Sequence, residues 1–339
     1  MTGETKLHPL RVRPGARFTC HGDGLCCSDV HLLGPVTGDE ARVLNAIDER
    51  ILAWSGDDRV LVTTVDGRCM FAGAGVCELH ARLGPEVKPA SCKQFPFMLV
   101  TTPTGGRVTT EHRCPCRSMG ERAPLTSDAA LASTTHATRH IAGPLWLDDE
   151  RSVSVEEWEI MEAPLIARLQ REDPLDVLDA APLSGDAERW DALAVDFASE
   201  EGGGRFGAAI RRFGAAILAL RQRPTDDIDA ALPWGDAFDR AEARSEPGDP
   251  EEMLRDWVAD YVWSLEWAFF GTFRAARSEL SSRVAIARQI ASELEQDGAR
   301  ADRAMAEAIA VVEAVGVADD YRAFLESLGR GDEPADRPE

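Results

Sequence analysis

The chain has 339 residues, a hydrophobic fraction of 44% and a formal net charge of −22 at pH 7, which suits about two globular domains with a real core. No charge-free apolar run approaches the ~20 residues that a membrane span requires, so we expect no membrane partner. An acidic surface repels nucleic acid as well as anionic lipid, and the composition therefore argues against nucleic acid as a partner too.

The chemically distinctive residues are confined to the first part of the chain. All eight cysteines and all seven histidines precede residue 141, and the net charge is +1 for residues 1–145 but −23 for residues 146–339. We therefore predict an α+β protein: a loop-rich cysteine-cluster domain with short strands and a few helices at 1–145, an acidic all-α domain at 146–328, and a disordered tail at 329–339. The acidic half could dock a basic protein or peptide substrate, or could simply form a solvated surface.

In the first half, the sequence predicts a helix, a strand and a hairpin in that order. Thr37 precedes Glu40 by three residues, which is the spacing of a capping box. The apolar face of the helix that begins there is expected to contain Val43, Ile47, Ile51 and Trp54. Residues 59–67 alternate as a strand does, and residues 95–112 read as two strands around a turn at Gly105 and Gly106.

The second half begins with two helical patterns. Ser154 and Glu157 have the capping-box spacing, and Pro164 should kink that helix or end it early. A second helix has the heptad seam Phe206, Ile210, Phe213, Ile217 and Leu220. Gly207 and Gly214 lie one heptad apart on it, so we expect a neighbouring helix to approach closely there.

An aromatic-rich helix follows, with charged residues that argue for burial among other helices rather than in a bilayer. Its expected apolar face consists of Leu254, Trp257, Val258, Tyr261, Val262, Leu265 and Phe269. Two more helices are predicted near 278–296 and 300–328. Residues 221–252, rich in Pro, Gly and Asp, are predicted to form an internal linker or an excursion from the helical domain.

The cysteines indicate a metal centre. The N-terminal segment has no apolar signal region, so we expect a cytoplasmic protein, in which thiols stay reduced and favour metal ligands over disulfides. The candidate ligands are Cys20, Cys26, Cys27, Cys69, Cys77, Cys92, Cys114 and Cys116. Adjacent cysteines such as Cys26 and Cys27 can serve one centre only if the backbone turns between them. Eight thiols would suffice for two four-cysteine sites, or for one site with thiols to spare.

The motifs "FTCHGDGLCC", "CMFAGAGVCELH", "CKQFPF" and "CPC" resemble the YkgJ-type cysteine-cluster family named for its CxxCxxCC motif, a zinc- or iron-chelating domain. The order C-x7-C-x-L-H and then C-x-x-F-P most resembles the flagellin lysine-N-methylase branch. The resemblance covers about residues 15–120. It implies a bound metal, an iron–sulfur ([4Fe–4S]) cluster or alternatively zinc. For that branch it also implies methyl transfer from S-adenosylmethionine to a protein lysine.

The chain departs from the family motif at one position. Asp23 stands where the second cysteine of CxxCxxCC is expected, and it is a candidate ligand although a carboxylate is a harder donor than a thiolate. Alternatively Asp23 does not ligate, and Cys116 replaces the lost ligand. His21 and His80 neighbour cysteines and could ligate or orient a ligand. The pair His136 and His140 lacks the glutamate of a zinc-protease motif.

Three functions remain open from the sequence. The first is a metal-cluster enzyme that methylates protein lysines, the second a non-catalytic zinc- or iron-binding adaptor, and the third a thiol redox sensor. No general base is identifiable, and no glycine-rich turn after a strand marks a nucleotide site. Should S-adenosylmethionine bind, a cluster iron without a cysteine ligand could chelate its amino and carboxylate groups.

Overall fold

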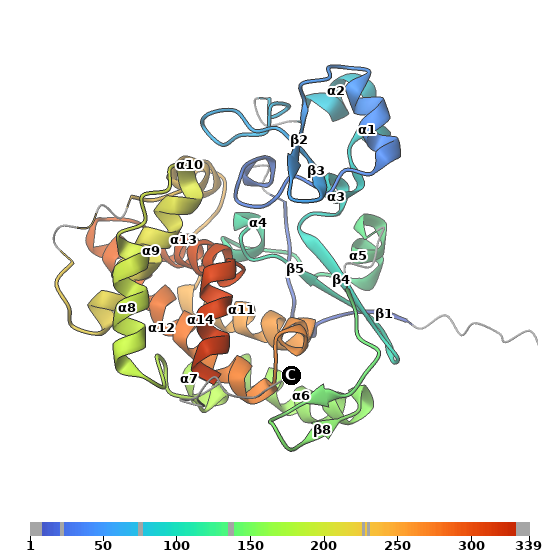
Figure 1. Cartoon of the computed structure of the whole chain (residues 1–339). Coiled ribbons are helices and arrows are strands. Elements are labelled where there is room, and N and C mark those ends of the chain that lie inside the picture. Colours follow the sequence, from blue (N-terminus) through green and yellow to red (C-terminus); the bar gives the residue numbers. More distant parts are fainter. Residues whose placement is uncertain are drawn as a thin grey trace, which may run out of the picture.

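A computed structural model describes residues 9–20, 24–73, 77–134, 139–225, 228 and 231–329, and shows a mixed α/β protein with small sheets and a helical C-terminal region (Figure 1). The strands are β1 (Leu10–Val12), β2 (Leu52–Ser55), β3 (Asp58–Leu61), β4 (Phe97–Thr102), β5 (Gly105–Thr110), β6 (Arg139–His140), β7 (Leu145–Trp146) and β8 (Ser152–Val153). The first helices are η1 (Leu25–Cys27), α1 (Gly38–Asn45), α2 (Glu78–Leu83), η2 (Pro85–Val87), α3 (Ala90–Gln94), α4 (Pro115–Ser118) and α5 (Ser127–Ser133). The later helices are α6 (Val155–Leu169), α7 (Pro174–Leu178), α8 (Ala187–Ala198), α9 (Gly204–Leu220), α10 (Gly235–Glu242), α11 (Pro250–Ser264), η3 (Glu266–Phe269), α12 (Phe273–Gln296), α13 (Ala301–Gly316) and α14 (Asp319–Gly329).

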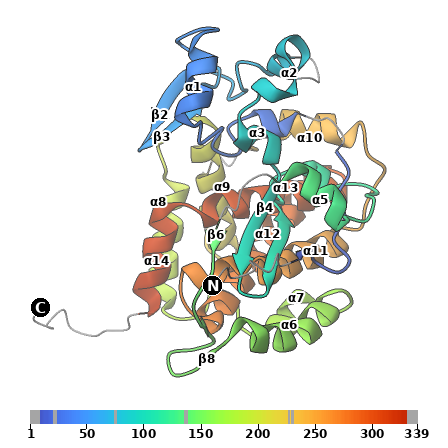
Figure 2. The same ribbon diagram turned by 90° about the vertical axis from the view of Figure 1, so that its right-hand side faces the viewer.

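The elements between residues 38 and 83 lie at one end of the molecule. In both views α1, α2 and the β2–β3 hairpin are at the top, and α6 and β8 are at the bottom (Figures 1 and 2). The four-stranded sheet, in the order β1-β5-β4-β6, lies between these ends. Helix α11 packs against β5, so the sheet and the helical region are in direct contact.

The predicted hairpin is confirmed, with its turn slightly earlier than expected. Thr102 pairs with Gly105 across the antiparallel β4–β5 ladder, so residues 103–104 form the turn. Gly106 instead pairs with Leu10 of the parallel strand β1. A Cβ atom at Gly106 would lie 3.0 Å from the side chains of Leu10 and Leu99. This glycine therefore allows close packing between strands rather than the turn itself.

The helix predicted after Thr37 is right at its start and wrong at its end. The capping box between Thr37 and Glu40 is present, but α1 ends at Asn45. Trp54 lies in β2, opposite Arg59 of β3, and the guanidinium group of Arg59 stacks on its ring at 4.9 Å. This pairing removes residues 52–55 from the helix, and Trp54 is 66% exposed instead of buried. Of the four residues expected on one apolar face, only Ile51 is buried.

Three expectations for the second half need correction. Helix α6 has the predicted capping box at Ser154 and does not end early at Pro164. It continues to Leu169, because buried residues before and after the proline, Trp158 and Leu169, lie in one core. The helix predicted at 300–328 is divided into α13 and α14, since α13 ends at Gly316. The predicted linker 221–252 contains α10. In and beside α10 the large side chains Trp234 and Phe238 are buried, so this part is core rather than linker.

The expected close approach at the heptad seam is confirmed for Gly214. A Cβ atom there would lie 2.5 Å from the backbone nitrogen of Ala198 and 2.7 Å from the carbonyl oxygen of Ala194, both in α8. Phe213 and Ile217 of the seam are completely buried. Helices α8 and α9 therefore pack backbone to backbone along this seam.

The main hydrophobic core crosses residue 145. It includes Leu25, Val100 and Met119 from the first part together with most of the buried residues of the helical region. The division into domains at 145 stays a prediction, and the tail at 330–339 lies outside the described residues. None of the helices in the described ranges is both long and apolar enough to cross a membrane.

Candidate functional site

Four of the predicted ligands surround one small core near the N-terminal end. Cys69 is buried in it, and Cys27, Cys77 and Cys92 pack against it. The other buried members of this core are Leu33, Val36, Ala41, Leu44, Ile51, Leu61 and Leu79. We call the four cysteines the cysteine core. They come from three separate segments of the chain, as a site assembled by the fold requires.

Short backbone pairings bring the segments of the cysteine core together. The backbone nitrogen of Cys69 donates to the carbonyl oxygen of Cys27 at 2.7 Å. Cys77 forms a β-bridge with Ala72, whose nitrogen in turn donates to the carbonyl oxygen of Cys69 at 2.8 Å. Helix α3 carries Cys92. The loops that bear these cysteines are thus fixed by their own main-chain hydrogen bonds.

The thiols of the cysteine core affect each other electrostatically. Burial, with smaller contributions from the neighbouring Cys27 and Cys77, raises the pKa of the Cys69 thiol to about 11. Burial likewise raises the pKa of the Cys92 thiol to about 12, with added contributions from Cys69 and Cys27. Both thiols are therefore neutral at pH 7 in the protein without metal. A metal would have to displace their protons, because only the thiolate is a ligand.

The adjacent pair Cys26 and Cys27 meets the condition set by the sequence. Both lie in the 3-10 turn η1, which follows Gly24 in the left-handed conformation. Their sulfur atoms are 4.0 Å apart. Two thiolates on one tetrahedral zinc, each about 2.3 Å from the metal, are separated by roughly 3.8 Å. The turn therefore lets both sulfurs approach a single centre.

The other predicted ligands are not part of the cysteine core. Cys114 and Cys116 are buried on and before α4, which contacts α10 and α13. Cys20 is exposed. Asp23 lies outside the described residues. This arrangement favours one site with thiols to spare over two four-cysteine sites.

The histidines are mostly occupied by other groups. His31 stacks on Phe95 with ring centroids 4.0 Å apart, and its Nε2 lies 3.0 Å from the carbonyl oxygen of Cys26. His140 contacts the hydroxyl of Thr101 at 2.9 Å. His80 is exposed on α2, whereas His21 and His136 lie outside the described residues.

The donor set fits a zinc or iron–sulfur site in its chemistry. Thiolates are the soft ligands that both centres use. Among the described residues, no three His, Cys, Asp or Glu side chains are already arranged to hold a metal ion. Residues 21–23 and 74–76, which separate Cys20 from Cys26 and Cys69 from Cys77, are outside the described ranges.

A buried network of charges joins the first 145 residues to α11. Asp260 accepts hydrogen bonds from Arg13 and Arg117, both at 2.5 Å, and lies 2.8 Å from Nε2 of His112. Arg13, Arg117 and Arg122 also pair with Asp256. Burial alone would raise the pKa of Asp260, but Arg117 and Arg13 outweigh it and hold that pKa well below its usual value. The network fixes α11 against the sheet.

A second group of titratable residues lies where the two parts of the chain meet, and sequence reasoning missed it. We call it the junction cluster. It consists of Glu111, Arg113, Tyr261, Glu266, Glu279, Arg283, Glu313 and Tyr321, each of which interacts electrostatically with at least two others or pairs directly with one. Its contributors are the segment after β5, then α11, η3, α12, α13 and α14.

Most charges of the junction cluster are paired. Arg113 donates to Glu111. Arg283 donates to Glu279 at 3.0 Å and to Glu313 at 3.4 Å. The indole nitrogen of Trp257 also donates to Glu313, at 2.7 Å. Two arginines thus pair with three of the four glutamates.

Glu266 is the exception. Within the described residues its carboxyl group has no hydrogen bond and no ion pair. Burial raises its pKa, and the nearby carboxylates of Glu313 and Glu111 raise it too, against the opposing effect of Arg139 and Arg113. A partly exposed carboxyl group with a raised pKa is typical of a general acid or base. In the sequence, the only signal was a charge inside the aromatic run "LEWAFF".

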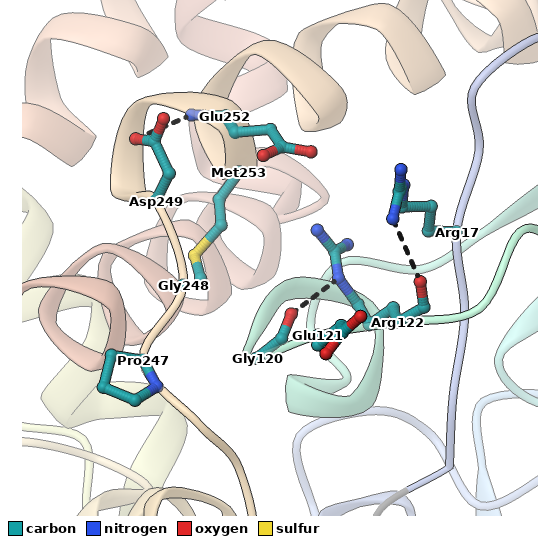
Figure 3. A pocket seen from close by; sticks show the side chains of 9 residues that line it. All are labelled: Arg17, Gly120, Glu121, Arg122, Pro247, Gly248, Asp249, Glu252 and Met253. Atoms are coloured by element: carbon teal, nitrogen blue, oxygen red, sulfur yellow. Dashed lines mark hydrogen bonds between the residues drawn. The ribbon is translucent and has the colours of Figure 1, made fainter.

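A cavity of about 230 Å³ lies elsewhere, between residues 120–122 and the start of α11 (Figure 3). Its walls contain Arg17, Gly120, Glu121, Arg122, Pro247, Gly248, Asp249, Glu252 and Met253. Both arginines donate to backbone carbonyl oxygens, Arg17 to residue 122 and Arg122 to residue 120. Because its charged side chains have both signs, the cavity indicates no particular class of ligand.

Comparisons with known proteins were made at three levels. No protein-family model, no curated protein and no solved structure matches the chain.

Proposed function

We propose that the chain is a metal-binding protein in which four thiols drawn from Cys26, Cys27, Cys69, Cys77 and Cys92 hold an iron–sulfur cluster, within a loop-rich cysteine domain. One observation carries the proposal: thiols from three separate segments pack around a single small core. The mutual effect of these thiols on their pKa values supports it, because a positive metal would stabilise all of them as thiolates at once. Zinc on the same thiols is the alternative.

We further propose that the protein is an enzyme that transfers a methyl group from S-adenosylmethionine to lysine side chains of a protein. The resemblance of the cysteine motifs to the lysine-N-methylase branch supports this reaction. The charge of −23 on residues 146–339 supports a basic substrate protein. A zinc- or iron-binding adaptor without catalytic activity is the competing function, and it rests on the same cysteines.

The test is the content of iron, zinc and acid-labile sulfide after oxygen-free purification. We expect iron and sulfide, and a broad absorption band near the blue edge of the visible spectrum. Cys69→Ser and Cys92→Ser should each lose most of the metal, because each removes a thiol of the cysteine core. Cys116→Ala is the matched control and should keep it, since Cys116 lies outside that core.

Three other results of the metal analysis would each contradict part of the proposal. A colourless protein loaded with zinc would replace the iron–sulfur proposal by the adaptor. A metal-free protein whose thiols oxidise in pairs would replace both by a redox sensor. Loss of metal in Cys116→Ala, with metal kept in Cys69→Ser, would contradict the assignment of ligands.

A further inference from the structure

We propose that His31 is a positioning residue of the proposed metal site, because its ring holds the peptide unit between Cys26 and Cys27 so that both thiols face one centre. The inference rests on the proposed function in one respect, namely that these two cysteines belong to a metal site. Three features of the described residues carry it: the contact of the imidazole with the backbone between the cysteines, the hydrogen bonds that fix the rest of this turn, and the stacking of the imidazole on Phe95.

The first feature is the peptide unit that joins the two adjacent cysteines. Nε2 of His31 lies 3.0 Å from the carbonyl oxygen of Cys26. That oxygen and the backbone nitrogen of Cys27 belong to the same planar unit, and the nitrogen donates to the carbonyl oxygen of Gly24 at 3.0 Å. Both polar groups of the unit therefore have a partner. Rotation of the unit would change the directions of the two side chains, and it would break at least one of these contacts.

The second feature is the attachment of this turn to the cysteine core. The backbone nitrogen of the buried Cys69 donates to the carbonyl oxygen of Cys27 at 2.7 Å. With the turn fixed in this way, the sulfur atoms of Cys26 and Cys27 are 4.0 Å apart. The hydrogen bonds from Cys27 and Cys69 are made by backbone groups. The contact from His31 is made by a side chain, so a substitution can remove it while the backbone hydrogen bonds stay available.

The third feature is the stacking of the imidazole on a second segment that carries a thiol. The rings of His31 and Phe95 are nearly parallel, with centroids 4.0 Å apart and an angle of 5° between the planes. Phe95 directly follows α3, three residues after Cys92, and its backbone nitrogen donates to the carbonyl oxygen of Ser91 at 3.0 Å. The imidazole therefore lies between the turn of the adjacent cysteines and the end of the helix that carries Cys92. It fixes the two segments relative to each other before a metal binds.

The same contacts argue that His31 is not itself a metal ligand. Its Nδ1 lies 3.0 Å from the carbonyl oxygen of Leu32, and its Nε2 lies 3.0 Å from that of Cys26. A histidine binds a metal through the lone pair of a ring nitrogen, and here each nitrogen faces a carbonyl oxygen. His31 therefore acts on the direction of the thiols. Groups that orient the ligands of a metal site typically contribute about 10–100-fold to metal affinity.

Two substitutions separate the hydrogen bond of His31 from its stacking. His31→Phe keeps an aromatic ring for Phe95 but has no donor for the carbonyl oxygen of Cys26. His31→Gln removes the ring, but its amide N–H can reach the position of Nε2. The experiment is a titration of the metal-free, full-length proteins with cobalt(II) chloride without oxygen, because a thiolate site for zinc or iron also takes cobalt. The absorption bands of the cobalt–thiolate complex give the dissociation constant.

We expect His31→Phe to weaken cobalt binding about 10–100-fold, and His31→Gln to bind cobalt much more tightly than His31→Phe does. The bands of bound cobalt should also shift in His31→Phe, because the thiols approach the metal from altered directions. A loss of stability alone would leave the spectrum of the bound form unchanged. His140→Phe is the matched control: it makes the same change at an exposed position of β6, where the histidine contacts Thr101, and should bind cobalt as the unaltered protein does.

A second measurement tests the pair of thiols without a metal. Phenylarsine oxide bridges two thiols: two As–S bonds form, and the oxygen leaves as water with both thiol protons. Cys26→Ser gives the uptake by the remaining thiols, which is subtracted. We expect the uptake that depends on Cys26 to be lower in His31→Phe than in His31→Gln.

Equal cobalt affinity of His31→Phe and His140→Phe would overturn the proposal. Cobalt binding by His31→Gln as weak as that of His31→Phe would also overturn it, because packing of the ring would then be what matters. If the unaltered protein binds no cobalt, the proposed metal site falls, and phenylarsine oxide decides about His31 alone. Lower uptake by His31→Phe would then support its positioning of the thiols, and equal uptake would exclude it.

Discussion

The carboxyl group of Glu266 should make the stability of the protein depend on pH in an unusual direction. Its pKa is raised in the folded chain, so above pH ~4.3 the unfolded chain releases a proton that the folded chain retains. Stability therefore falls as the pH rises through this window. Glu266→Gln removes the effect and should increase the free energy of unfolding at pH 7 by roughly 0.5–2 kcal/mol. Urea unfolding at pH 7 and at pH 4 measures it.

The gain should be much smaller at pH 4, where the carboxyl group is mostly protonated in both states. Glu295→Gln, on an exposed part of α12, should change little at either pH. A loss of stability in Glu266→Gln at pH 7 would show that Glu266 has a structural partner.

For single residues, the sequence could predict the cysteines as candidate ligands but not the raised pKa of Glu266. Cysteine spacing is local, and the turn that brings Cys26 and Cys27 together lies within three residues. The pKa of Glu266 is raised by burial and by Glu313 and Glu111, which are distant in the sequence. No periodicity encodes that meeting, because it depends on how α11, α12 and α13 pack.

At the level of helices and strands, the close packing of α8 against α9 can be tested by a single substitution at Gly214. Gly214→Ala would place a Cβ atom 2.5 Å from the backbone of Ala198. Backbone atoms cannot move aside as a flexible side chain can, so the two helices must separate. We expect a loss of about 1–3 kcal/mol in the free energy of unfolding, the cost of overpacking a core, measured by denaturant unfolding.

The matched control is Gly143→Ala. Nothing lies within 4 Å of a Cβ atom at Gly143, and its stability should stay within about 0.5 kcal/mol of the unaltered protein. Equal stability of the two variants would mean that α8 and α9 are less closely packed than the structure shows.

Element starts were predictable and element ends were less so. The capping boxes at Thr37 and Ser154 are local hydrogen-bond patterns, and both are present. The end of α1 depends on the pairing of Trp54 with Arg59, and the passage of α6 through Pro164 depends on packing on both sides of the proline. Tertiary contacts decided these cases over local propensity.

For the molecule as a whole, the buried charges around Asp260 are the main link between the first 145 residues and α11. Asp260→Asn leaves Arg13 and Arg117 with less compensation and should cost about 3–5 kcal/mol. Because the pKa of Asp260 is lowered in the folded protein, its contribution is present above pH ~3.9 and is lost as the pH falls through the folded value. The difference between Asp260→Asn and the unaltered protein should thus be largest near neutral pH. Thermal unfolding from pH 7 down to pH 3 measures it.

Asp191→Asn is the control, since Asp191 also pairs with two arginines, Arg221 and Arg223, but is 21% exposed. Its loss should stay within about 1 kcal/mol. If Asp260→Asn and Asp191→Asn lost equal stability, the buried ion pairs of Asp260 would contribute no more to stability than the exposed ion pairs of Asp191.

The whole-molecule organisation was only partly open to prediction. The change of charge and cysteine content along the sequence correctly indicated a helical C-terminal region, whereas a boundary at residue 145 stays a prediction. It could not indicate that Leu25, Val100 and Met119 would join the helical core. Shared burial leaves no trace in the composition of either part.

The carboxylates of α11 are matched by guanidinium groups of Arg13 and Arg117, which belong to the first 145 residues. Cutting the chain near residue 145 would leave Asp256 and Asp260 in one fragment and Arg13 and Arg117 in the other, each without its partner of opposite charge. Neither fragment should then fold as it does in the intact protein. Two such fragments made together in one cell should associate, because each supplies the opposite charges that the other needs to fold.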